Sequence, residues 1–158
     1  MNIAIVGMGT VGGAAIRLLE ENAAELERKL GFKLHLRATA SLEVEKRKEV
    51  DTPTGRRLLT RDWREAVEHP EADIVVEVVG GTTIAYEVQT TALALGRPVV
   101  TANKELLGLR GAELAQLAHD NKTSLHLEAS AGGCIPILNA LREGIAADSI
   151  EAVYGILN

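Results

Sequence analysis

The residues best suited to chemistry lie near the start of the chain, in a glycine-rich run. Gly7, Gly9 and Gly12 match the pattern G-x-G-x-x-G. Glycines at these positions allow a tight turn, a close approach of the backbone to a pyrophosphate, and close packing of a helix on a strand. An apolar run at 2–6 precedes the pattern and helical spacing follows it, which is the context that dinucleotide binding requires. A strand–helix turn that holds no ligand is the alternative.

Three later loops carry other polar residues that could meet a cofactor or a substrate. They lie at 80–83, 101–105 and 128–136. In an open α/β sheet, ligands bind outside the carboxyl ends of the strands, so we expect these loops to gather there. The first two loops offer backbone amides and small hydroxyls to a nicotinamide, and Lys104 offers a cation to an anionic substrate or a phosphate. A lysine near a helix start is equally often only solvated, and that alternative stays open.

The residues after the second predicted strand bear on the choice between NAD and NADP. An acidic residue at the strand end would hold the ribose 2′-hydroxyl of NAD. Ser41 lies near that end, Glu43 is two residues on, and basic residues follow at 46–48 and 56–57. Residues 41–64 hold seven basic and five acidic residues, a local charge of +2 in a chain of −5. This charge favours NADP slightly, and a solvated loop is the alternative.

Length and composition are those of a soluble globular protein. The 158 residues suit one domain, and 46% are hydrophobic and 25% charged. Four aromatic residues are too few for a stacking platform on single-stranded nucleic acid, and the negative net charge disfavours such a partner. The uncharged start of the chain is too short and too glycine-rich for a membrane span, and it lacks the basic region of a signal peptide. Cys134 is the only cysteine, which favours a cytoplasmic protein.

Apolar runs with strand and helix periodicity alternate along the chain. They predict strands at 2–6, 33–40, 57–60, 73–79, 98–101, 123–128 and 150–157. Helices are expected at 11–30, 62–68, 82–95, 111–120 and 137–144, and residues 41–57 are expected to be irregular. The run at 73–79 is apolar almost throughout, which indicates burial on both faces, as in a parallel sheet. The alternation predicts an α/β fold with a doubly wound parallel sheet.

Several segments together resemble homoserine dehydrogenase. They are the glycine run at 7–12, Val78-Val79-Gly80-Gly81-Thr82, Thr101-Ala102-Asn103-Lys104-Glu105, Glu128-Ala129-Ser130 leading to Ile135-Pro136, and Gly155-Ile156-Leu157-Asn158. Their order and spacing fit the family from one end of the chain to the other. The resemblance implies a Rossmann-type NAD(P)-binding domain over 1–130. Over 131–158 it implies the first helix and strand of a substrate and dimerisation domain.

The same resemblance implies an oxidoreductase that interconverts homoserine and aspartate 4-semialdehyde. In the family this NAD- or NADP-dependent step serves the synthesis of threonine, methionine and isoleucine, and a cytoplasmic homodimer is expected. The cofactor contacts carried over from the family are Gly7, Met8, Gly9, Thr10, Val11, Gly12, Thr82, Thr101 and Lys104. Lys104 would also contact the substrate.

Two further properties follow from the resemblance. The family binds a monovalent cation, usually sodium, and the matching residues here are Glu128, Ala131, Gly133 and Ile135. The family's proton-handling Asp and Lys match no residue of this chain and are expected beyond residue 158. The chain alone is therefore expected to be inactive, although it would bind the cofactor.

Departures from the family pattern leave part of this interpretation open. Cys134 and Ala131 stand where the family usually has Gly and Val, and a Cys restricts the loop if that position needs a positive φ. The residues after the second strand also lack the family's usual Arg-Asp, which leaves the cofactor preference open.

Two other functions compete with this one. An aldehyde dehydrogenase, such as aspartate-semialdehyde dehydrogenase, would need Cys134 as a thiolate nucleophile with a base beside it, and no histidine lies at an obvious spacing. A nucleotide-binding or regulatory module without catalysis is the second. The four histidines, at 35, 69, 119 and 126, form no zinc-ligand pattern with one another or with the cysteine.

Overall fold

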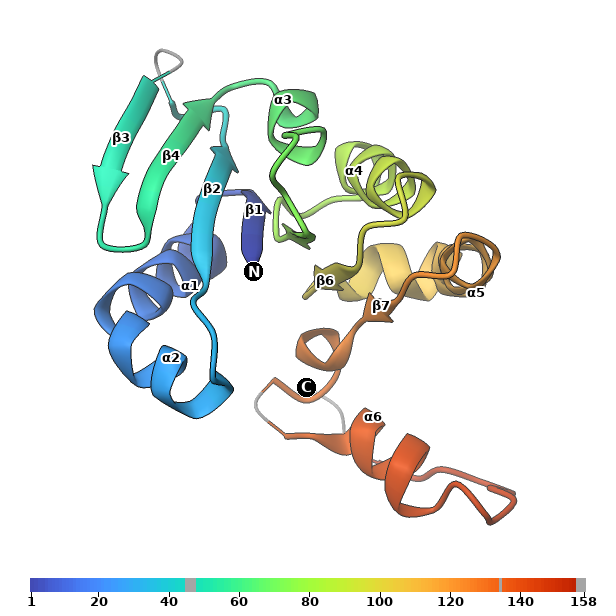
Figure 1. Ribbon diagram of the computed structural model, residues 1–158. Helices are drawn as coiled ribbons and strands as arrows, with labels where there is room; N and C mark the ends of the chain where they lie inside the picture. The colour runs from blue at the N-terminus through green and yellow to red at the C-terminus, as the bar shows by residue number, and fades with distance from the viewer. Residues whose placement is uncertain (45–47, 134, 156–158) are drawn as a thin grey trace.

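The computed structural model describes residues 1–44, 48–133 and 135–155, and Figure 1 shows one sheet with helices on both faces. The strands of this part of the chain are β1 (Asn2–Val6), β2 (His35–Ala40), β3 (Lys48–Thr52), β4 (Gly55–Thr60), β5 (Ile74–Glu77), β6 (Val99–Thr101) and β7 (Leu125–His126). The helices are α1 (Thr10–Glu21), α2 (Ala23–Leu30), α3 (Trp63–Val67), α4 (Thr83–Ala94), α5 (Lys104–Asp120) and α6 (Ile137–Asn139). Two short turns complete the elements, η1 (Glu128–Ser130) and the π-helical η2 (Ala140–Gly144).

The strand order is β3-β4-β2-β1-β5-β6-β7, and every neighbouring pair is parallel except β3 with β4. Side chains of β1 alternate between the two faces of the sheet, and both sets are buried. Ile3 and Ile5 belong to an apolar cluster with Ile16 of α1, whereas Ala4 and Val6 belong to a larger cluster that takes in α3, α4 and α5. The predicted doubly wound α/β fold is therefore confirmed, with one antiparallel edge strand added.

The parallel strands end in register along one edge of the sheet. Val6, the last residue of β1, pairs with Ala40 of β2 and with Glu77 of β5. Ala40 pairs in turn with Thr60 of β4, and Glu77 pairs with Thr101 of β6. The chain leaves β1 toward β2 on one side and later returns to β5 on the other. The topological switch point, where such sheets bind ligands, thus lies between the carboxyl ends of β1 and β5.

Residues 48–52 form the strand β3, where the sequence analysis expected irregular structure. The strand pairs with β4 through a tight turn, in which the Thr52 hydroxyl donates to the Gly55 carbonyl oxygen at 2.7 Å and Gly55 has a φ of +108°. The turn chemistry of 52–55 was recognised from the sequence, but its hairpin was not. As an edge strand, β3 carries charged residues and lacks the apolar run that marks a central strand.

Two predicted helices have different bounds in the structure. The predicted helix 11–30 is two helices, α1 and α2, that meet at Asn22, whose side-chain amide donates to the Leu18 carbonyl oxygen at 3.0 Å. The predicted helix 111–120 is the second half of α5, which begins at Lys104 and is kinked at Arg110. The low helix propensity of Gly108 and Gly111, which flank the kink, weakened the sequence pattern.

The strand predicted at 150–157 is wrong for the residues that the structure describes. Residues 150–155 form no strand, and 156–157 lie outside the described residues. A strand requires a partner for its backbone groups, and none lies beside this described segment. Val153 and Tyr154 are accordingly 72% and 93% exposed. The predicted strand at 123–128 is confirmed only for β7, because η1 begins at Glu128.

The packing of α1 on β1 predicts opposite effects for two adjacent glycines. A Cβ at Gly12 would lie 1.9 Å from the Gly7 carbonyl oxygen, whereas a Cβ at Gly13 meets nothing closer than 3.5 Å. We expect Gly12→Ala to lower the free energy of unfolding by about 3 kcal/mol, because the backbone must move. Gly13→Ala should raise it by about 0.5–1 kcal/mol. Urea unfolding of both variants measures the difference, and equal stability of the two would contradict this account of the turn.

Candidate functional site

The glycine-rich turn is built from three glycines that serve different purposes. Gly7 has a φ of +108°, and a Cβ there would lie 2.5 Å from the Val78 carbonyl oxygen. A Cβ at Gly12 would likewise overlap the backbone of Gly7, at 1.9 Å from its carbonyl oxygen. A Cβ at Gly9, by contrast, would meet no protein atom within 4 Å. The packing of the protein itself therefore explains Gly7 and Gly12, while Gly9 faces open space that a ligand can enter.

The first turn of α1 points its backbone N–H groups into the same space. The helix begins at Thr10, directly after Gly9, and no side chain caps it. Thr10 and Val11 are exposed. Such an uncapped N-terminus, with free N–H donors and the positive end of the helix dipole, suits a phosphate group. The Met8 side chain packs on the apolar cluster beneath the turn, so only the main chain of Met8 is left to contact a ligand.

A buried carboxylate organises the neighbouring loops. Glu77, at the end of β5, is completely buried and accepts three hydrogen bonds. The Val79 backbone N–H donates to Oε1 at 2.8 Å. The Gln89 amide of α4 and the Thr101 hydroxyl of β6 donate to Oε2 at 2.7 and 2.9 Å. One side chain thus joins β5, α4 and β6 at the carboxyl edge.

Asn103 extends this network to the start of α5. Its backbone N–H donates to the Thr101 hydroxyl at 3.0 Å, and its side-chain oxygen accepts from the Leu106 N–H at 3.1 Å, which caps the helix. Its side-chain N–H₂ donates to the Gly81 carbonyl oxygen at 2.7 Å. The loop after β5 and the loop after β6 are therefore joined by one residue, immediately beside Lys104.

The predicted contacts of these loops differ in how they can act. Thr101 is only 1% exposed and its hydroxyl is committed to the network, so its side chain does not face the site. Thr82 is half-buried ahead of α4 and makes no side-chain cap. Lys104, the first residue of α5, is exposed, and among the described residues its ammonium group forms no ion pair. Of the three side chains, the ammonium of Lys104 is the one free to meet an anion.

The two arginines predicted to attract a 2′-phosphate do not lie near the end of β2. Arg57 is buried, and its guanidinium pairs with Glu20 of α1 at 3.0 Å. Arg56 pairs with Glu49 of β3. It lies four residues before the end of β4, which is about 13 Å at the rise per residue of a β-strand. Arg56 was expected in irregular structure and Arg57 at the start of a short strand, but the hairpin of β3 and β4 holds both away from the cofactor edge. The basic run at 46–48 was also proposed, and 46–47 lie outside the described residues.

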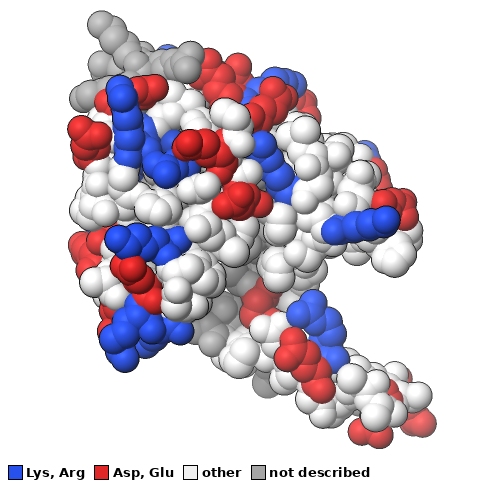
Figure 2. Space-filling model, in the orientation of Figure 1, with Lys and Arg blue, Asp and Glu red and all other residues white. Residues whose placement is uncertain are grey.

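Arg61 occupies the position that these two arginines were expected to fill. It directly follows β4, and its Nε donates to the Val44 carbonyl oxygen in the loop after β2. The same loop is held by Ser41, whose carbonyl oxygen accepts from the Val44 N–H at 3.2 Å. The sequence pattern did not single out Arg61, because only the pairing of β4 with β2 brings it to this loop. On the face seen in Figure 2, acidic and basic side chains are intermingled and form no broad basic patch.

The loop predicted to bind a cation is held by its acidic residue. Glu128 accepts from the Leu138 N–H at 3.0 Å and from the Asn139 N–H at 2.9 Å, so its carboxylate holds the first turn of α6. Gly133 has a φ of +63°, and Cys134 lies outside the described residues. The described ranges contain no group of three His, Cys, Asp or Glu side chains that could hold a metal ion.

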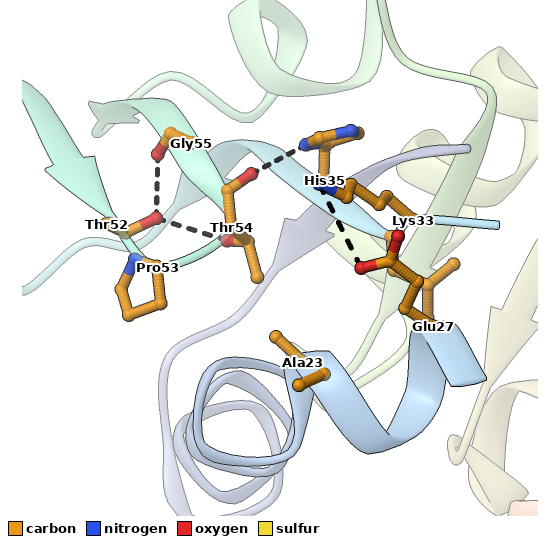
Figure 3. A pocket seen from close by; sticks show the side chains of 10 residues that line it. Ala23, Glu27, Lys33, His35, Thr52, Pro53, Thr54 and Gly55 are labelled. Atoms are coloured by element: carbon orange, nitrogen blue, oxygen red, sulfur yellow. Dashed lines mark hydrogen bonds and ion pairs between the residues drawn. The ribbon is translucent and has the colours of Figure 1, made fainter. Parts of the chain in front are cut away.

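A cavity of about 420 Å³ lies at the opposite edge of the sheet (Figure 3). It is enclosed by α2, the start of β2 and the β3–β4 turn. His35 Nδ1 lies 2.8 Å from the Thr54 carbonyl oxygen in its wall, and Lys33 faces Glu27 at 3.9 Å. The cavity is at the amino ends of the strands, so it is distinct from the edge that carries the glycine-rich turn.

Sequence reasoning missed Glu77 and Gln89 as residues of the site. A glutamate within the apolar run Ile74-Val75-Val76-Glu77-Val78-Val79 was a usable signal, because a charge is rarely buried without dedicated partners. Gln89 gave no signal of its own. Its role depends on the packing of α4 against β5 and β6, which no local pattern contains.

The glycine-rich turn, the uncapped helix and the switch point define a dinucleotide-binding domain of the Rossmann class. A family model described as the NAD-binding domain of homoserine dehydrogenase matches residues 7–128. The chain therefore belongs to the family of homoserine dehydrogenase NAD-binding domains, as the resemblance implied. This membership disfavours the aldehyde dehydrogenase alternative.

Relatives and solved structures agree with this assignment. The homoserine dehydrogenases of Neisseria gonorrhoeae and Corynebacterium glutamicum are each 40% identical over all 158 residues, and the chain spans 36% and 35% of their lengths. A homoserine dehydrogenase structure from Thiobacillus denitrificans matches 93% of the chain and 33% of its own, at 35% identity and a TM-score of 0.80. A hyperthermophilic archaeal homoserine dehydrogenase in complex with NADPH matches 92% of the chain and 49% of its own, at 25% identity and a TM-score of 0.69. None of the described helices is long and apolar enough to cross a bilayer.

The buried network predicts different effects for two isosteric substitutions of threonine. Thr101→Val removes a donor to Glu77 and an acceptor of the Asn103 N–H and of the Gln89 amide, and these three partners stay buried. We expect it to lower the free energy of unfolding by about 2 kcal/mol. Thr39 is equally buried, but its hydroxyl has no partner among the described residues, so Thr39→Val should be neutral or stabilising. Thermal or urea unfolding tests both, and a neutral Thr101→Val would contradict the assigned network.

Proposed function

We propose that the chain is the cofactor-binding part of a homoserine dehydrogenase that interconverts homoserine and aspartate 4-semialdehyde. The observation that carries the proposal is the open space at Gly9, in front of the uncapped first turn of α1. The pyrophosphate would lie there, against main-chain groups of residues 7–12. The relatives, which are named for this activity, support the reaction.

The nicotinamide half of the cofactor would lie over the loops after β5 and β6. Thr82 would contact it with its side chain, and Thr101 with its main chain because its hydroxyl is buried. Lys104 would contact cofactor and substrate with its free ammonium group, which suits the carboxylate of homoserine. Hydride transfer also needs a proton donor or acceptor, and we assign none to the described residues.

NADP is the cofactor that this arrangement favours. The end of β2 carries Ser41 rather than an acidic residue, so this position does not supply the carboxylate that would hold the ribose 2′-hydroxyl of NAD. Arg61 is anchored to the same loop through its Nε, which leaves the terminal nitrogens of the guanidinium for a phosphate. The archaeal relative solved with NADPH supports this choice.

The remaining assignments follow from family membership. Residues 1–130 would form the cofactor domain and 131–158 would begin a substrate and dimerisation domain, in a cytoplasmic homodimer that serves threonine, methionine and isoleucine synthesis. A sodium ion would bind Glu128 with main-chain oxygens of Ala131, Gly133 and Ile135. The carboxylate is oriented by the turn of α6, and its oxygens keep lone pairs for a cation.

Gly9→Val tests cofactor binding directly. The Cβ of the new side chain would meet no protein atom within 4 Å and would point into the proposed pyrophosphate position, so we expect the fold to persist and binding to be lost. Calorimetric titration with NADPH and NADH measures the affinity, and circular dichroism verifies the fold. Equal affinities for the original chain and the variant would refute the assignment of the site.

The proposed role of Arg61 is tested by its effect on cofactor preference. Arg61→Gln removes the charge near the 2′-phosphate, so NADPH should bind roughly tenfold more weakly while NADH binding is unchanged. Arg56→Gln is the matched control, because this arginine pairs with Glu49 at the far end of β4. The ratio of the two dissociation constants is the measurement. A ratio that shifts equally in both variants would show that general charge, rather than Arg61, sets the preference.

A further inference from the structure

The two halves of the proposed cofactor site are constructed in different ways. The pyrophosphate half consists of backbone, held by the packing of Gly7 and Gly12 against their neighbours. In the nicotinamide half, Gly80 and Gly81 have φ values of +77° and +67°, and a Cβ on either would meet no atom within 4 Å. The close packing that fixes Gly7 and Gly12 is therefore not found at Gly80 and Gly81, so we ask which hydrogen bonds hold these two residues.

That interaction is the hydrogen bond from the Asn103 side-chain amide to the Gly81 carbonyl oxygen, at 2.7 Å. In the described part of the chain it is the only side-chain hydrogen bond to residues 80–82. Asn103 is itself 8% exposed and fixed by two other hydrogen bonds, to the Thr101 hydroxyl and from the Leu106 N–H. The donor is therefore held by two further hydrogen bonds, whereas the glycine loop that accepts from it has no second side-chain hydrogen bond among the described residues.

The hydrogen bonds close into a ring. One oxygen of Glu77 accepts from the Val79 N–H, and the backbone leads from Val79 to Gly81. From Gly81 the ring passes to the Asn103 side chain and, through the Asn103 N–H, to the Thr101 hydroxyl. The Thr101 hydroxyl donates to the second oxygen of Glu77. Removing the bond between Asn103 and Gly81 would open the ring at its most exposed point and leave its buried side intact.

We propose that Asn103 is a positioning residue, which clamps the Gly80-Gly81 loop and so shapes the nicotinamide half of the site independently of the pyrophosphate half. This inference rests on the proposed function. Asn103 does not need to touch the cofactor, because it acts through the main chain of Gly81. Its loss should weaken binding of the nicotinamide and leave binding of the adenosine and pyrophosphate unchanged.

Asn103→Ser is the variant that separates these effects. Serine is a good helix N-cap, so α5 keeps its cap while the amide that holds Gly81 is lost. Asn121→Ser is the matched control, because it makes the same substitution at the other end of α5, where the Asn121 amide donates to the Leu117 carbonyl oxygen. If Asn103→Ser does not fold, Asn103→Asp keeps the size and the cap and replaces the donor with an oxygen.

The 158-residue chain is titrated with NADPH and with 2′-phospho-ADP-ribose, which lacks the nicotinamide. NADH and ADP-ribose form a second pair of probes. We expect Asn103→Ser to weaken the binding of NADPH about tenfold and the binding of 2′-phospho-ADP-ribose less than about twofold. Asn121→Ser should leave both affinities unchanged. A purely structural effect would weaken the binding of both ligands equally, and that result would overturn the inference, as would unchanged affinity for both.

If the original chain bound none of the four ligands, the proposed function would fall together with the inference. If it bound them and only the selective loss were missing, the inference alone would fall.

Discussion

The carboxylate of Glu77 imposes the constraint on which the carboxyl edge of the sheet depends. A buried charge is tolerated only where its oxygens accept hydrogen bonds, and no cation pairs with this one among the described residues. Its three donors come from three places: the chain after β5, helix α4 and strand β6. Because the carboxylate must keep these donors, the spacing of those elements is fixed. The loops that carry Gly81 and Lys104 begin from this fixed base.

The two sides of the switch point obtain their rigidity differently, and this difference shapes what a ligand meets there. On the β1 side the glycine turn packs against backbone, Gly7 on that of Val78 and Gly12 on that of Gly7, and no side chain caps the first turn of α1. On the β5 side a Cβ added at Gly80 or Gly81 would meet no atom within 4 Å, and the Gly81 carbonyl oxygen accepts from the Asn103 side chain. The first arrangement suits an invariant group such as a pyrophosphate. The second, if Asn103 acts as proposed, would let the protein adjust the position of a reactive ring with little change in phosphate binding.

Sequence patterns predicted the parts of the molecule that are determined locally. The glycine-rich turn, the helix expected at 62–68 and the helix end expected at residue 30 all depend on residues close together in the chain. The structure confirms them, with Asp62 as the cap of α3 and Gly31 as the residue that ends α2. The errors concern long-range pairing. Arg56 and Arg57 were placed near the cofactor because the hairpin of β3 and β4 was not foreseen, and Arg61 was overlooked because its neighbour in space is 17 residues away. Glu77 shows the same limit, since its three partners come from separate elements.

Glu128 joins the cofactor-binding edge to the residues that follow it. It lies just beyond β7, and its two oxygens accept from the first turn of α6, ten and eleven residues later in the chain. Each oxygen still has a lone pair, so cation binding and this helix contact are compatible. The proposed cation would therefore join the main-chain oxygens of Ala131, Gly133 and Ile135 to the same carboxylate that holds the first turn of α6.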